Sequence, residues 1–135
     1  MKTLIALCSL VLLVSGARAE SPGVTVDGDY SVYYSVFPSS FLQPDVASAY
    51  QLVRAKDRAI INVSVRKKLA DGTDREQSAI VNGTRSDLIH KLPLSFTEVR
   101  EQGAIYYLAE IRVSTAEKLY FKLSVQPDPN KSPIT

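Results

Sequence analysis

His90, the one histidine of the chain, is the side chain best suited to acid–base chemistry near neutral pH. In its segment, SDLIHKL, Asp87 lies three residues earlier and could orient the imidazole, with Ser39 or Ser40 as the nucleophile of a hydrolase. No G-x-S-x-G turn or other nucleophile motif accompanies these residues. A surface histidine beside Lys91 is therefore the simpler interpretation, and we assign no catalytic residue.

Few side chains are available for metal binding. Cys8 is the only cysteine, and it lies in an N-terminal apolar run, so a zinc site would have one histidine and otherwise carboxylates. The sequence DGTD at 71–74 is similar to the start of a calcium loop, but it lacks the third oxygen ligand and the late glutamate that an EF-hand requires. We therefore expect no metal and no other cofactor.

Three cations, Arg54, Lys56 and Arg58, form the tightest basic cluster around a predicted helix. Positive charges near a helix C-terminus complement its macrodipole and need no ligand. The same cluster is also a candidate site for contact with a protein partner. Both interpretations remain open at the level of sequence.

Aromatic residues gather just before and within the same region. Tyr33, Phe37, Phe41 and Tyr50 are predicted to form a cluster that docks the helix on a strand, because alternation places Tyr33 and Phe37 on one face of that strand. A sugar-binding platform would favour exposed flat rings, and the chain contains no tryptophan. The cluster is therefore interpreted as structural.

Residues 1–19 have the three parts of a cleavable secretory signal peptide. Lys2 is the positive charge, an apolar run extends to Val14, and Ala-Arg-Ala at 17–19 places small residues at the positions that signal peptidase recognises. The run is too short to span a hydrocarbon core of about 30 Å. We expect export to the periplasm, cleavage after Ala19 and no transmembrane segment afterwards.

Cleavage changes the charge and the chemistry of the chain. The formal net charge of +2 includes Lys2 and Arg18, whose removal leaves 14 basic against 14 acidic residues. A neutral domain lacks the basic footprint of a nucleic-acid-binding protein, so we expect no nucleic acid partner. Cys8 would leave as well, which excludes a disulfide in the mature domain.

After the signal, apolar and polar residues alternate with the period of two that half-buried strands require. Strands are predicted near residues 24–26 and at 29–37, 58–69, 75–84, 94–101, 104–113 and 118–126. The Asp71-Gly72 and Gln102-Gly103 pairs predict hairpin turns.

One helix is predicted over residues 44–54, where Pro44 suits the first helical position and an apolar stripe faces the sheet. The stripe consists of Val46, Ala49, Tyr50 and Val53. Residues 86–92 are ambiguous and could form a single helical turn. The tail at 127–135 has three prolines and is predicted to be loose, or to be the start of a missing last strand.

About seven short strands with one inserted helix predict a single mainly β domain over residues 20–126. A parallel α/β sheet would need a helix at every crossover. An immunoglobulin-like antiparallel β-sandwich is the expected fold, and a small lipocalin-like barrel is the alternative.

Three segments resemble a known family: FPSSFLQPDVASAYQLVRAKDRAIINVSV at 37–65, AIYYLAEIRV at 104–113 and LYFKLSVQP at 119–127. They are similar to the domain-of-unknown-function-4426 family of small exported gammaproteobacterial proteins. The resemblance implies a periplasmic immunoglobulin-like domain and carries over no catalytic residue. This chain has Pro38 where members have asparagine, and it ends at Thr135, where members continue into a last strand with aromatic residues.

These features favour a non-enzymatic periplasmic module that binds a protein, with an open sheet edge that takes a strand from its partner. Two alternatives remain, a hydrolase that uses His90 and a structural accessory protein without a ligand.

Overall fold

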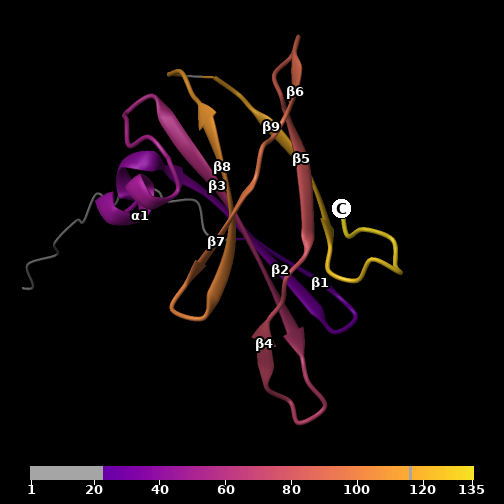
Figure 1. The fold of residues 1–135 in the computed structure, drawn as a ribbon. Coiled ribbons are helices and arrows are strands. Elements are labelled where there is room, and N and C mark those ends of the chain that lie inside the picture. Colours follow the sequence, from indigo (N-terminus) through magenta and orange to yellow (C-terminus); the bar gives the residue numbers. More distant parts are fainter. Residues whose placement is uncertain (1–22, 116) are drawn as a thin grey trace, which may run out of the picture.

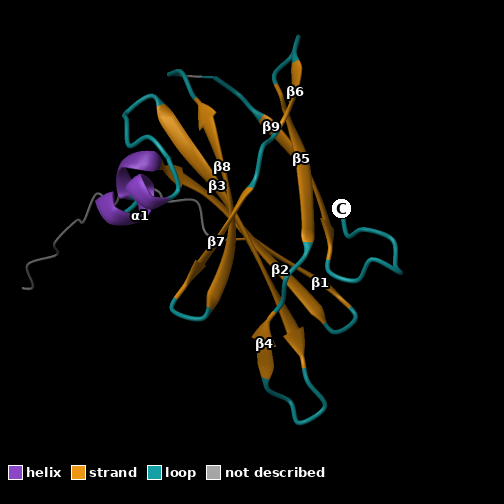
Figure 2. Ribbon diagram, in the orientation of Figure 1, coloured by secondary structure: helices purple, strands orange, loops and turns teal. Residues whose placement is uncertain are grey.

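The computed structural model describes residues 23–115 and 117–135, so the predicted signal peptide lies outside the described residues. The described part contains two antiparallel sheets, one α-helix and one 3-10 turn (Figures 1 and 2). The elements run in the order β1 (Gly23–Asp27), β2 (Tyr30–Pro38), the 3-10 turn (Ser39–Phe41), α1 (Pro44–Ala49), β3 (Arg58–Lys68), β4 (Asp74–Glu76), β5 (Ile80–Ser86), β6 (Lys91–Pro93), β7 (Thr97–Glu101), β8 (Ala104–Arg112) and β9 (Tyr120–Gln126).

The larger sheet has the strand order β1-β2-β3-β8-β7, with β4 added beside one end of β3. The smaller sheet has the order β6-β5-β9, and Figure 1 shows it on the opposite side of the larger sheet from α1. All the strand pairs are antiparallel. Because the two sheets are separate, the predicted β-sandwich is confirmed and a closed barrel is excluded.

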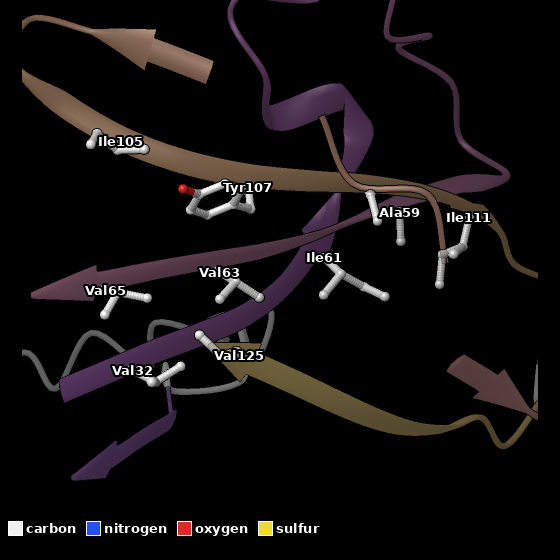
Figure 3. Packing of buried hydrophobic residues seen from close by; sticks show 10 residues of the cluster. Val32, Ala59, Ile61, Val63, Val65, Ile105, Tyr107, Ile111 and Val125 are labelled. Carbon is white, nitrogen blue, oxygen red and sulfur yellow. The ribbon is translucent and has the colours of Figure 1, made fainter. Parts of the chain in front are cut away.

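The main core fills the space between the sheets. In β3 every second side chain points inward, as the sequence alternation predicts, and β8 contributes the matching residues of its own inner face. Figure 3 shows Val125 of β9 among them, because the smaller sheet closes the core from the other side. The buried members are Val32, Ala59, Ile61, Val63, Val65, Ile105, Tyr107, Ala109, Ile111 and Val125.

A second apolar layer lies on the opposite face of the larger sheet. Ile60, Leu108 and Val99 are buried there, although alternation alone places Ile60 on the solvent face of β3. Phe37, which pairs with Ile60 from β2, extends this layer, and the segment around α1 covers it with Leu42, Tyr50 and Leu52. The centre of the larger sheet is thus covered on both faces.

The helix is shorter than the predicted span of 44–54, because the chain turns out of it at Gln51, which has φ 58°. The Leu52 N–H donates to the Ala47 carbonyl (2.8 Å) and the Gln51 N–H donates to the Ser48 carbonyl (3.4 Å). This pair of bonds is the Schellman arrangement that ends many helices. It directs Leu52 into the second layer and leaves Val53 exposed, so the predicted four-residue stripe is wrong.

The predicted strand at 75–84 is divided between the two sheets. β4 extends the hairpin from β3, and the chain then crosses to the smaller sheet, where it continues as β5. The crossing is fixed where the Gln77 N–H donates to the Val65 carbonyl (2.9 Å) and the Ala79 N–H donates to the Tyr107 hydroxyl (2.8 Å). A long-range contact with Tyr107 decides this division, so the local pattern could not show it.

Two further segments differ from their predictions. The segment 86–92 forms the hairpin turn between β5 and β6 rather than a helical turn. The tail at 127–135 is held rather than loose, because Val125 and Ile134 exchange both backbone hydrogen bonds (2.9 and 2.8 Å). Ile134 therefore lies beside β9 as the first residue of a further antiparallel strand would.

We predict that Ile60→Ala lowers the free energy of unfolding by about 2–5 kcal/mol, as much as the same change at Ile61 in the main core. Both side chains are almost fully buried, but they lie on opposite faces of β3. Val26→Ala, on a β1 side chain that is 66% exposed, is the control and should change stability by less than about 0.5 kcal/mol. Urea denaturation measures all three, and an Ile60→Ala value as small as that of Val26→Ala would contradict the second layer.

Candidate functional site

The two sheets differ in width, and the difference leaves part of the sandwich open. The larger sheet has six strands and the smaller has three, so the inner faces of β1 and β2 extend beyond the edge strand β9. Gly23 and Thr25 on the inner face of β1 are small, and the ring of Tyr34 lies against Gly23, where any Cβ would collide with it. The result is a groove of about 650 Å³ between the two sheets.

The groove is lined mainly by apolar side chains from both sheets. Val32, Tyr34 and Val36 contribute from β2, and Tyr34 is still 41% exposed. Phe121 and Leu123 contribute from β9. An apolar surface in this position has the character of a sandwich core that lacks one neighbouring strand.

The outer edge of β9 borders this groove. β9 pairs with β5 along one side through all of its seven residues, whereas on the other side only Val125 is paired, with Ile134. In an antiparallel ladder the residues that bond to one side alternate along the strand, so Leu123 and Phe121 point their N–H and C=O groups the same way as Val125. Within the described residues, these groups of Leu123 and Phe121 have no backbone partner.

The predicted basic cluster is dispersed into separate contacts. Arg58 forms an ion pair with Glu110, whose other oxygen accepts a hydrogen bond from the Val53 N–H (2.7 Å). Arg54 donates to the Ser40 carbonyl (3.0 Å), and Lys56 is exposed. Because the helix already ends at Ala49, the three cations do not lie at its C-terminus, and the macrodipole does not account for them.

The predicted aromatic cluster is only partly assembled. Phe37 and Tyr50 pack on the second apolar layer, whereas Tyr33 and Phe41 are exposed. The Tyr50 hydroxyl lies 3.3 Å from the Arg100 carbonyl and 3.2 Å from Glu101 Oε1, so it connects the end of α1 to β7. Desolvation and the neighbouring Glu101 carboxylate raise the pKa of Tyr50.

His90 lies in the turn between β5 and β6, where its Nδ1 is 3.4 Å from Asp87 Oδ2. The other carboxylate oxygen, Asp87 Oδ1, accepts hydrogen bonds from the N–H groups of Ile89 (2.7 Å) and His90 (2.6 Å). Ser39 is completely buried, and its hydroxyl donates to the Ala55 carbonyl (3.0 Å) and accepts from the Ala55 N–H (2.9 Å). Of the two candidate nucleophiles, Ser39 is therefore held in a structural contact, whereas Ser40 is exposed.

No three histidine, cysteine or acidic side chains in the ranges 23–115 and 117–135 are placed to hold a metal ion together. No helix in the same ranges is long and apolar enough to cross a bilayer.

The groove could not be predicted from the sequence, although the period of two over 118–126 puts Leu119, Phe121, Leu123 and Val125 on one face of that strand. The groove depends on the division of strands between the two sheets, which is a long-range property. A local signal was present in the small residues Gly23 and Thr25 opposite that strand, but only the topology shows that they face it.

The fold and groove define a small antiparallel β-sandwich with an incompletely covered inner face. The family model described as "Domain of unknown function (DUF4426)" matches residues 24–135, and the chain belongs to this family. The chain is similar to a DUF4426 family protein from Pseudomonas aeruginosa PAO1, whose crystal structure it matches at 42% identity and a TM-score of 0.72. The match covers 80% of this chain and 84% of the other. No curated protein matches the chain.

We predict that the pKa of Asp87 stays below its ordinary value in His90→Ala. The largest causes of the lowered pKa are the backbone N–H groups of His90 and Ile89, which alanine retains, whereas the imidazole contributes less. A lowered pKa means that the carboxylate stabilises the folded turn at neutral pH, and that this contribution disappears as the pH falls through the folded-state pKa. Carbon-detected NMR titration of the Asp87 carboxyl measures it, and a return to the ordinary value would favour a coupled His–Asp pair.

Proposed function

We propose that this protein is a non-enzymatic periplasmic module that binds a protein partner by adding a strand of that partner to the open edge of β9. The observation that carries this proposal is the unpaired backbone of Phe121 and Leu123 beside an apolar groove. Strand addition uses main-chain hydrogen bonds for affinity and alternate side-chain pockets for selectivity. The edge of β9 offers unpaired backbone groups for the hydrogen bonds and an apolar groove for the side chains.

The direction of the incoming strand follows from the contact that already exists. Ile134 lies antiparallel to β9 at Val125, and its two hydrogen bonds have normal lengths of 2.9 and 2.8 Å. A strand that continues this register past Thr135 would next bond to Leu123 and then to Phe121. Its inward side chains would cover the exposed faces of Tyr34 and Val36 across the groove.

The chemistry of the groove specifies the side chains of the partner segment. The inward residues of β9 near the open edge are apolar, and Lys122 points to the opposite face with Tyr120. The matching segment therefore has apolar residues at alternate positions and no inward charge, because an unpaired buried charge would be strongly unfavourable. The other edge of the same sheet, β6, has only three residues and ends in Pro93, which blocks pairing.

Periplasmic location and the absence of catalysis have separate support. The sequence of residues 1–19 has the parts of a secretory signal peptide, including the Ala-Arg-Ala cleavage triplet. The hydrolase alternative is disfavoured because Asp87 Oδ1 closes a turn and the Ser39 hydroxyl is buried against Ala55. Cell fractionation with detection of the processed N-terminus tests the location.

We predict that the amide protons of Phe121 and Leu123 exchange with solvent about a hundredfold or more faster than those of Lys122 and Ser124, which point toward β5. Exchange measured by NMR on the labelled full chain gives this comparison directly. Equal protection of all four amides would show that the edge is already paired and would contradict the proposal.

The binding itself is tested with a displayed library of random peptides. We expect the enriched peptides to have apolar residues at alternate positions and to slow the exchange of the Phe121 and Leu123 amides. Leu123→Pro should abolish this binding, while Leu123→Ala, which loses the same side chain but keeps the edge N–H, should retain it in weakened form. Equal loss in both variants would assign the effect to the side chain and would contradict strand addition.

A further inference from the structure

The turn between β5 and β6 carries the most exposed large apolar side chains of the described residues. Leu88 is 91% exposed and Ile89 is 85% exposed, whereas no other large apolar side chain in the ranges 23–115 and 117–135 exceeds about two-thirds. Figure 1 shows this turn as a projection at the top of the view, at the end of the smaller sheet. Two adjacent exposed branched residues are unfavourable in water and indicate a contact surface.

The backbone of this turn is well held even though its apolar side chains pack on nothing. The Asp87 N–H donates to the His90 carbonyl (3.1 Å), while Asp87 Oδ1 accepts from the N–H groups of Ile89 and His90. These bonds lower the pKa of Asp87, so its carboxylate stays ionised at neutral pH and remains hydrogen-bonded within the turn. Leu88 and Ile89 are therefore presented on an ordered support, which reduces the entropy cost of docking them.

The surface behind the tip is basic and amphipathic. Ser86 of β5 is paired with Lys91 of β6 on one side and with Tyr120 of β9 on the other. Because directly paired residues point to the same face of a sheet, Lys91 and Tyr120 share one face of the smaller sheet. Lys122 lies on the same face two residues further along β9. Glu117 is the carboxylate nearest in sequence to Tyr120, and its Oε2 accepts a hydrogen bond from the Ser114 N–H (3.2 Å).

This combination matches the surface of an anionic phospholipid bilayer. Apolar side chains at the extremity enter the boundary between headgroups and acyl chains, a tyrosine suits the headgroup level, and lysines behind them attract lipid phosphates. Tyr120 is about half exposed, as a residue at that level must be. A purely apolar protein pocket would accommodate Leu88 and Ile89 but would have no use for the two lysines behind them.

We propose that the β5–β6 tip is a peripheral contact site for an anionic phospholipid surface. Leu88 and Ile89 insert below the headgroups, and Lys91 and Lys122 contact phosphates. Lys91 and Lys122 lie on the face of the smaller sheet opposite to Leu123, which lines the groove.

The absence of tryptophan from the chain allows a local test. In the full-length Leu88→Trp variant, we expect the emission to shift to shorter wavelength on addition of vesicles of phosphatidylglycerol and phosphatidylethanolamine, and to be quenched by brominated acyl chains. Vesicles of phosphatidylcholine alone should produce little change, because they carry no net charge. The matched control is Val26→Trp on β1, which follows residues 1–22 closely in the sequence and would therefore report binding of vesicles through them. We expect this variant to keep the emission of a water-exposed ring.

One further variant and a change of salt concentration test the role of charge. Lys91→Glu combined with Lys122→Glu in the Leu88→Trp background should weaken vesicle binding about tenfold or more, as should a high salt concentration. Far-ultraviolet circular dichroism establishes that the Leu88→Trp variant remains folded with and without the two charge reversals.

Unchanged emission of the Leu88→Trp variant with anionic vesicles would overturn the proposal, as would an equal shift with phosphatidylcholine. A shift that depends only on protein concentration would instead assign the tip to contact between copies of this chain and would also overturn it.

Discussion

The burial of β3 on both faces is the constraint on which the rest of the structure depends. Its inner residues, from Ala59 to Val65, form the centre of the core between the sheets, and Ile60 on its other face requires a separate cover. That requirement explains the early end of α1, because the turn at Gln51 brings Leu52 and Tyr50 over Ile60. Glu110 of β8, which is paired with Ile60, holds the segment that follows α1. It forms an ion pair with Arg58 and accepts a hydrogen bond from the Val53 N–H.

The same arrangement determines where the molecule remains open. The larger sheet is built outward from β3 in both directions, whereas the smaller sheet covers only its middle. The inner faces of β1 and β2 therefore extend past β9, and the groove and the unpaired edge are two consequences of one mismatch in width. Gly83 in β5 allows the side chains of Leu94 and Leu123 to approach its backbone closely.

Several parts of this structure could be predicted from the residues themselves. Alternation identified the inner faces of β3 and β8, and the Gln102-Gly103 pair has the positive φ angles (52° and 80°) that its hairpin turn requires. Other parts could not be predicted because they depend on distant partners. The division between β4 and β5 depends on Tyr107, and the held tail depends on Val125. Arg54, Lys56 and Arg58 form one cluster in sequence, but Glu110 and Ser40 draw two of them into separate contacts.

Local physical chemistry was sufficient for the class of fold, since a period of two and turn residues at regular spacing act within a few residues and lead to antiparallel strands. It was also sufficient for the signal-like character of residues 1–19, which depends on composition alone. Only the tertiary structure decided which strand edge stays open and which apolar residues stay exposed. Leu119, Phe121 and Leu123 resemble core residues in sequence, as do Leu88 and Ile89. Whether such a side chain is covered depends on the width of a sheet and the position of a turn, and both arise from contacts between residues far apart in the chain.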